Sequence, residues 1–102
     1  MGTVDFAKAL ADETRQKIME ICCCRKLSVS EIVEQLNVTQ PTVSHHLKVL
    51  RDAGLVDVER RGKEIYYTLN QDRVAKACCQ VAGTFAPEVP VEMVQGCRDK
   101  SK

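Results

Sequence analysis

The chain has no Trp, only two Phe and two Tyr among 102 residues, and no long apolar run. With so few aromatic rings, aliphatic side chains, Ala and Cys must fill the core, which favours packed helices over a β-sandwich. No apolar stretch approaches the roughly 18 residues of a membrane helix, and no basic and apolar leader opens the chain. We therefore expect a cytoplasmic protein with no membrane partner. This length suits one domain over residues 1–102, with 91–102 as a flexible C-terminal tail.

Neither sign of charge dominates, because 15 Lys and Arg stand against 14 Asp and Glu. Any inference about nucleic acid therefore depends on where the cations lie. The sequence also lacks the Cys-x-x-Cys spacing of zinc ribbons and thioredoxin-like sites. A reducing compartment disfavours a static disulfide framework, so the six cysteines are candidates for metal binding, redox sensing or burial. No nucleophile with a positioned base and no nucleotide loop is recognisable, so we expect no enzyme.

Two helices are predicted before residue 27. Residues 4–10 form a short one, and Asp12 is the expected N-cap of a second helix that runs from Glu13 toward Cys24. Three consecutive helical residues fan across roughly 200° of arc, so Cys22, Cys23 and Cys24 could not all face one core.

Two further helices joined by a tight turn are predicted next. A helix over 29–36 begins at a capping box formed by Ser28 and Glu31. The next helix begins after Thr39, whose hydroxyl is expected to cap it, and it closes at Gly54.

Beyond residue 54 the apolar period changes from 3.6 to 2. Apolar residues at 55–58 and 65–69 flank "RRGK" at 60–63, which predicts a β-hairpin with a basic tip. Residues 72–86 return to helical spacing. The apolar stripe of this last helix consists of Val74, Cys78, Val81 and Phe85. The expected fold is mainly α with a β-hairpin wing, a winged helix-turn-helix of four helices, two strands and a last helix.

The fourth predicted helix separates an apolar side from a polar one. Val43, Leu47 and Leu50 point to one side. The other faces carry Gln40, Thr42, Ser44, His45, Lys48 and Arg51. Gln can bond adenine in a bidentate manner, Ser and His can reach base edges or phosphates, and Lys and Arg place charge near the backbone.

A polar helix face is often only solvated, but the neighbouring hairpin tip adds a second basic element. Arg60, Arg61 and Lys63 would project from it into a minor groove or onto phosphates. We therefore predict binding to double-stranded DNA. His45 and His46 are poor candidates for a shared metal ion, because adjacent helical residues point about 100° apart.

Three segments carry a family resemblance: "LADETRQKIM" (10–19), "LSVSEIVEQLNVTQPTVSHHLKVLRDAGLV" (27–56) and "RRGKEIYYTL" (60–69). They resemble the ArsR/SmtB family of metal-sensing and metalloid-sensing repressors over about residues 4–86. The resemblance implies a homodimer through the first and last helices, which leaves a palindromic operator when an effector binds. It also implies DNA contacts at Gln40, Ser44 and His45, in agreement with the chemistry of those side chains.

The effector sites best known in the family are not matched. The arsenic motif Cys-x-Cys-x-x-Cys falls on Ser28, Ser30 and Val33 here, and the zinc and cobalt site lacks its His although Asp72 is present. No permanent cofactor is expected. The remaining candidates are cysteines: Cys23 and Cys24 from the second helix with Cys78 and Cys79 from the last helix, while Cys22 fits the core and Cys97 on the tail is an alternative third ligand.

Two kinds of thiol chemistry fit these residues. Soft thiolates suit As(III), Sb(III) or another thiophilic metal, and As(III) or Sb(III) would take three of them. We give this reading first place. The alternative is a dithiol switch that responds to peroxide or persulfide. A disulfide between neighbouring cysteines would require the helix end to fray, because adjacent Cα atoms lie about 3.8 Å apart, below the usual disulfide separation.

Overall fold

The structure, a computed structural model, describes residues 2–90. The predicted tail over 91–102, with Cys97, lies outside the described residues. The elements follow in the order α1 (Thr3–Leu10), α2 (Glu13–Ile21), β1 (Leu27–Ser28), α3 (Val29–Leu36), α4 (Gln40–Asp52), β2 (Val56–Arg61), β3 (Glu64–Leu69) and α5 (Gln71–Phe85). This order confirms the predicted winged helix-turn-helix, with one strand more than the sequence indicated.

The additional strand, β1, makes the wing a three-stranded antiparallel sheet in the order β1-β3-β2. Leu27 pairs with Tyr67 and Ser28 with Tyr66. A strand of two residues is too short to show an alternating pattern, and Ser28 also serves as a helix cap. Both predicted strands are confirmed as β2 and β3, and β1 was missed because its only signal is the pairing with β3.

The second helix ends earlier than predicted. It stops at Ile21, and Cys22 is its C-cap. The carbonyl oxygen of Cys22 accepts a hydrogen bond of 2.8 Å from the backbone N–H of Leu69. That oxygen is therefore paired with the end of β3, and residues 23–25 form bends. The prediction of a helix reaching Cys24 was wrong. The side-chain directions expected for three consecutive helical cysteines therefore do not apply.

The predicted caps are confirmed with one exception. Asp12 Oδ1 accepts from the Arg15 N–H at 3.0 Å, and Ser28 forms the complete capping box with Glu31. Thr39 occupies the N-cap position of α4, but its hydroxyl lies 2.9 Å from that of Thr42 and makes no cap bond. The predicted capping role of Thr39 was wrong, because its hydroxyl is paired with the Thr42 hydroxyl and not with a backbone N–H of the helix.

The core lies between the helices and the base of the sheet. Its fully buried side chains are Ile18, Cys22, Ile32, Val43, Leu47, Leu50 and Leu55. The predicted stripe of α5 contacts the core only in part. Val74 and Val81 are partly buried and pack against it, whereas Cys78 and Phe85 are exposed, and Ala77 is the buried residue of the helix. Within the described part of the chain, no helix is long and apolar enough to cross a membrane.

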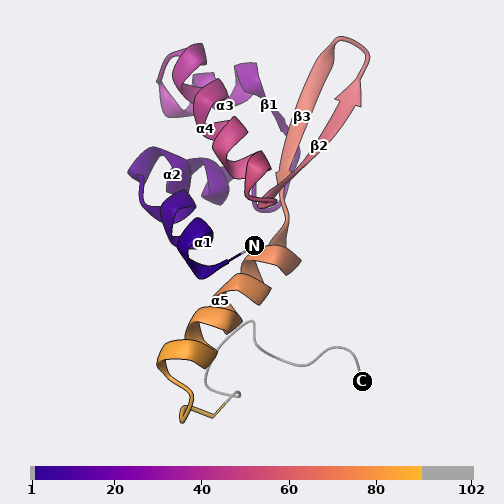
Figure 1. The fold of residues 1–102 in the computed structure, drawn as a ribbon. Helices are drawn as coiled ribbons and strands as arrows, with labels where there is room; N and C mark the ends of the chain where they lie inside the picture. The colour runs from indigo at the N-terminus through magenta and orange to yellow at the C-terminus, as the bar shows by residue number, and fades with distance from the viewer. Residues whose placement is uncertain (1, 91–102) are drawn as a thin grey trace.

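Figure 1 shows how this arrangement separates two ends of the molecule. The helix-turn-helix pair α3 and α4 lies at the same end as the tip of the β2-β3 hairpin. Helix α5 projects from the opposite end, and only its first part lies near the other helices. The fold therefore presents a helical pair and a wing together, while α5 extends away from them.

Candidate nucleic-acid interface and thiol site

The predicted DNA-contacting face of α4 is solvent-exposed. Val43, Leu47 and Leu50 are buried and fix the rotation of the helix. All the predicted polar and basic residues of the helix are exposed: Gln40, Thr42, Ser44, His45, Lys48 and Arg51. Arg60, Arg61 and Lys63 are likewise exposed around the hairpin turn, where Gly62 has a positive φ of 61°. The basic tip and the polar helix face thus lie at one end of the molecule (Figure 1).

Two of these cations have acidic partners. Lys48 Nζ lies 3.0 Å from Asp52 Oδ2, one helical turn away. Arg61 Nε donates to Glu59 Oε2 at 2.8 Å, and its guanidinium lies 5.8 Å from the centre of the Tyr66 ring. Both cations retain further N–H donors, so each can contact a phosphate while it keeps its acidic partner.

His46, the neighbour of His45, has a structural position. Its ring is buried at 8% exposure, and its Nδ1 accepts a 3.0 Å hydrogen bond from Arg15 Nη1. Arg15 also donates to the carbonyl oxygens of Ala9 at 2.8 Å and Lys8 at 3.0 Å, at the end of α1. One guanidinium therefore joins α1, α2 and α4. Spacing gave no signal for this contact, because Arg15 and His46 are 31 residues apart.

The segment 22–26 between α2 and β1, hereafter the thiol loop, contains three cysteines with different environments. Cys22 is fully buried, as predicted, and burial raises the pKa of its thiol to about 11. Cys23 and Cys24 are joined by a vicinal disulfide. Such a bond is possible here because α2 ends before the pair.

A pocket of about 420 Å³ brings this disulfide together with the last helix. It is lined by Cys23, Cys24, Leu69, Gln71, Val74, Ala75 and Cys78. Cys78 carries a free, exposed thiol. Three of the four principal sensor candidates thus line one pocket, whereas Cys79 is half-buried and is not among its lining residues. In the described range, no group of three or more His, Cys, Asp or Glu side chains is arranged to hold a metal ion.

The thiol loop is bonded to several neighbouring elements. Besides the Cys22–Leu69 bond, Gln71 Nε2 at the start of α5 donates to the Cys23 carbonyl oxygen at 2.7 Å. Arg25 donates to Gln35 of α3 at 3.0 Å. Sequence reasoning missed these bonds, since each joins positions remote in the chain. They place the cysteine pair between the helix-turn-helix, the wing and α5.

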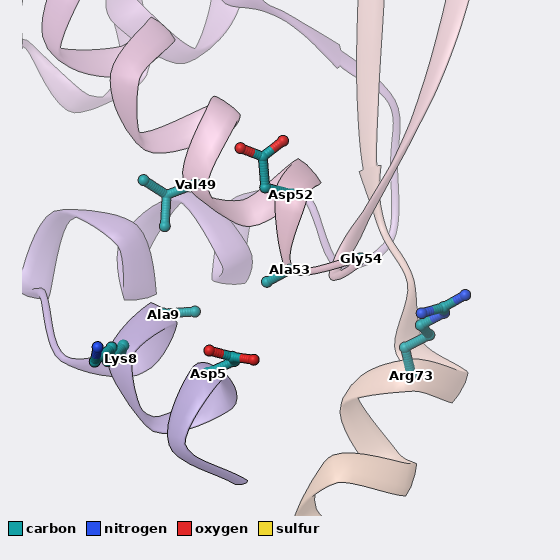
Figure 2. Close-up of a pocket in the computed structure, with 8 residues that line it drawn as sticks. All are labelled: Asp5, Lys8, Ala9, Val49, Asp52, Ala53, Gly54 and Arg73. Atoms are coloured by element: carbon teal, nitrogen blue, oxygen red, sulfur yellow. The ribbon is translucent and has the colours of Figure 1, made fainter. Parts of the chain in front are cut away.

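A second hollow, which the sequence did not indicate, lies where α1, the end of α4 and α5 meet, with a volume of about 530 Å³. Figure 2 shows Asp5 and Lys8 on α1, Asp52 at the end of α4 and Arg73 on α5 around it. Gly54 has a φ of 76°, and a Cβ there would lie 2.7 Å from Arg73 Nη1. Glycine is therefore required at residue 54 by its backbone conformation, and its lack of a side chain leaves room for the guanidinium.

Together, the helix-turn-helix, the wing and the exposed cations define a winged helix-turn-helix DNA-binding protein. Residues 12–58 match the family profile described as bacterial regulatory protein, arsR family. The arsenical resistance operon repressor of Bacillus subtilis is 42% identical over 78 residues, which cover 71% of this chain and 74% of that protein. The transcriptional repressor SdpR of the same organism is 38% identical over 63 residues, covering 62% and 70%.

The fold agrees with these sequence relatives. Reduced HlyU from Vibrio cholerae has 32% sequence identity and a TM-score of 0.67, over 81% of this chain and 86% of that one. The chain belongs to the ArsR family of DNA-binding transcriptional regulators, and the predicted family resemblance is confirmed.

Proposed function

We propose that this chain is a transcriptional repressor whose affinity for operator DNA depends on the thiol state of Cys23, Cys24 and Cys78. One observation carries the proposal: the Cys23–Cys24 disulfide and the free thiol of Cys78 line the same pocket. The bonds from the thiol loop to α3, β3 and α5 support it, because they connect the cysteine pair to the elements expected to bind DNA and a second subunit.

Peroxide is the oxidant class that we assign to the reduced pair. One thiolate attacks the O–O bond and becomes a sulfenic acid, and the displaced hydroxide leaves as water. The second thiol then attacks the sulfenic sulfur, which closes the disulfide and releases a second water. Two thiols lose two electrons to one peroxide. Cys78 lines the same pocket, and attack of its thiolate on this disulfide would exchange the partners without a further oxidant.

Binding of As(III) is the second candidate, and it was the first choice on sequence alone. It is favoured by the three cysteines around one pocket and by the relative named as an arsenical resistance operon repressor. Arsenous acid would exchange its three hydroxyls for three cysteine sulfurs, and the protons of the three thiols would leave with the hydroxyls as three waters. This route requires the Cys23–Cys24 pair to be reduced first, whereas the peroxide route ends in the observed disulfide.

The same proposal includes a homodimer on a palindromic operator. Val4 of α1 is 66% exposed and Phe85 of α5 is 73% exposed. Each helix therefore presents a large apolar side chain that a second subunit could cover. Gln40, Ser44 and His45 would read bases, and the wing cations would contact phosphates. Regulation by DNA binding rather than catalysis agrees with the family.

The test is release of the reduced full-length chain from its own promoter DNA, followed by fluorescence anisotropy. Hydrogen peroxide, a persulfide donor and arsenite are added separately, with intact mass and free thiols measured in each case. We expect peroxide to release DNA with a loss of two hydrogens from the Cys23–Cys24 pair. Cys23→Ser and Cys24→Ser should abolish this release.

Two matched variants separate the alternatives. Cys97→Ser, in the tail, should leave peroxide release unchanged, and Cys78→Ser should slow the return to DNA binding when a thiol reductant is added. Release by arsenite alone, lost in Cys23→Ser, would establish the second candidate. Release that survives all three substitutions at residues 23, 24 and 78 would refute the proposed site.

A further inference from the structure

We propose that Glu59 is a positioning residue that connects the thiol loop to the wing, and that Lys26 is its partner on the loop. This inference rests on the proposed function. Neither residue belongs to α4 or lines the pocket of Cys23, Cys24 and Cys78. The inference assigns both a role in changing operator affinity when the Cys23–Cys24 pair is oxidised or reduced.

The contacts of Glu59 are divided between its two carboxylate oxygens. Oε1 accepts from Nζ of Lys26, the last residue of the thiol loop and two positions after Cys24. Oε2 accepts from Nε of Arg61 at 2.8 Å, on the same strand. One carboxylate thus contacts both the loop that holds the disulfide and a cation of the predicted DNA surface.

Strand pairing connects Glu59 to the segment that follows the thiol loop. Glu59 pairs with Tyr66 in the β2-β3 ladder, and Tyr66 pairs with Ser28 of β1, which follows the thiol loop. The Arg61 guanidinium lies over the same Tyr66 ring, 5.8 Å from its centre. Bonding by Lys26, and then by Arg61, lowers the pKa of Glu59 to about 2, so that its carboxylate is ionised at neutral pH.

A change at the disulfide can reach Arg61 through these contacts. Closing a bond between Cys23 and Cys24 restricts the backbone immediately before Lys26, and reduction removes the restriction. When Lys26 moves, Glu59 loses or regains one of its two cationic partners. Because Lys26 and Arg61 share the Glu59 carboxylate, the attraction between Glu59 and Arg61 then changes, and with it the availability of Arg61 for a DNA phosphate.

The experiment compares the operator Kd of the oxidised chain with that of the reduced chain. Lys26→Met should lower this ratio by about two- to fivefold, the range expected from one exposed ion pair. Glu59→Gln should lower the ratio similarly and should also tighten binding in both thiol states, because it removes a negative charge near the DNA. Lys26→Arg should restore the wild-type ratio.

Lys17→Met is the matched control, since Lys17 is an exposed cation of α2 that forms no ion pair among the described residues. It should leave the ratio unchanged. A wild-type ratio in both Lys26→Met and Glu59→Gln would overturn the inference while leaving the proposed function intact. Equal affinities of the two wild-type thiol states would instead overturn the proposed function, and the inference with it.

Discussion

Arg15 and His46 form a partly buried polar contact that connects α4 to the N-terminal helices. The Arg15 guanidinium can only donate, so the Nδ1 of His46 must accept and the ring is neutral in this arrangement. Burial is the main cause that lowers the pKa of His46. Asp12, with its Oδ1 3.7 Å from Nε2, acts in the opposite direction, and the charges of Arg15 and His45 lower the pKa further.

This contact predicts a stability that depends on pH. Because the folded pKa of His46 lies below its unfolded value of about 6.5, the stabilisation is present above that pH and is lost as the pH falls through and below it. The free energy of unfolding, measured by urea denaturation, should therefore be lower at pH 5.5 than at pH 7.5. His46→Gln should reduce that difference.

The exposed neighbour offers the control for this measurement. His45→Gln makes the same chemical change one residue away and should retain the pH dependence of the wild type. An unchanged difference between pH 5.5 and pH 7.5 in His46→Gln would show that other groups cause it.

Single residues were partly predictable. Burial of Cys22 followed from its position one turn after Ile18, and exposure of Ser44 and His45 followed from the apolar spacing of the helix. The Lys26–Glu59 and Arg15–His46 contacts did not follow, because they join residues 33 and 31 positions apart. Local periodicity and capping carry no information about such pairs.

At the scale of elements, helices α3 and α4 differ in how their N-termini are capped. Ser28 Oγ accepts the Glu31 N–H at 3.3 Å, and Glu31 Oε1 accepts the Ser28 N–H at 2.9 Å. The Thr39 hydroxyl makes no cap bond to α4. Only the first of these caps satisfies backbone donors at the helix end.

A pair of alanine substitutions tests this difference. Ser28→Ala should lower the free energy of unfolding by about 1 kcal/mol, since an N-cap bond is lost. Thr39→Ala should cost clearly less, because no backbone donor loses its partner. Thermal and urea denaturation of both variants measure the contrast, and equal losses would contradict the assignment of the caps.

Most elements could be read from local signals, and the two errors in the bounds and number of elements have a common cause. The capping box marked the start of α3 and Gly54 marked the end of α4 correctly. The end of α2 depends on a hydrogen bond from Leu69 to Cys22, and β1 depends on pairing with β3. Both errors therefore arose where a distant part of the chain supplies the partner.

For the whole molecule, the exposed apolar residues of α1 and α5 predict how the proposed dimer forms. Phe85→Glu places a charge on the apolar surface of α5 and should shift the chain toward monomer in sedimentation velocity. Operator affinity should fall with it, because two half-sites are then bound separately. Lys76→Glu reverses the charge at an already polar, exposed position of the same helix and serves as the control. A dimer of unchanged stability in Phe85→Glu would place the subunit interface elsewhere.

Helix α5 connects the thiol loop to the surface proposed for the dimer. Its first residue, Gln71, is bonded to the Cys23 carbonyl, and its 15 residues extend about 22 Å at 1.5 Å per residue. Ala77 is buried, and Val74 and Val81 pack against the core, so the first three turns of the helix are held by the rest of the domain. A change in the thiol loop would therefore reach the exposed Phe85 only by shifting the helix as one rigid unit.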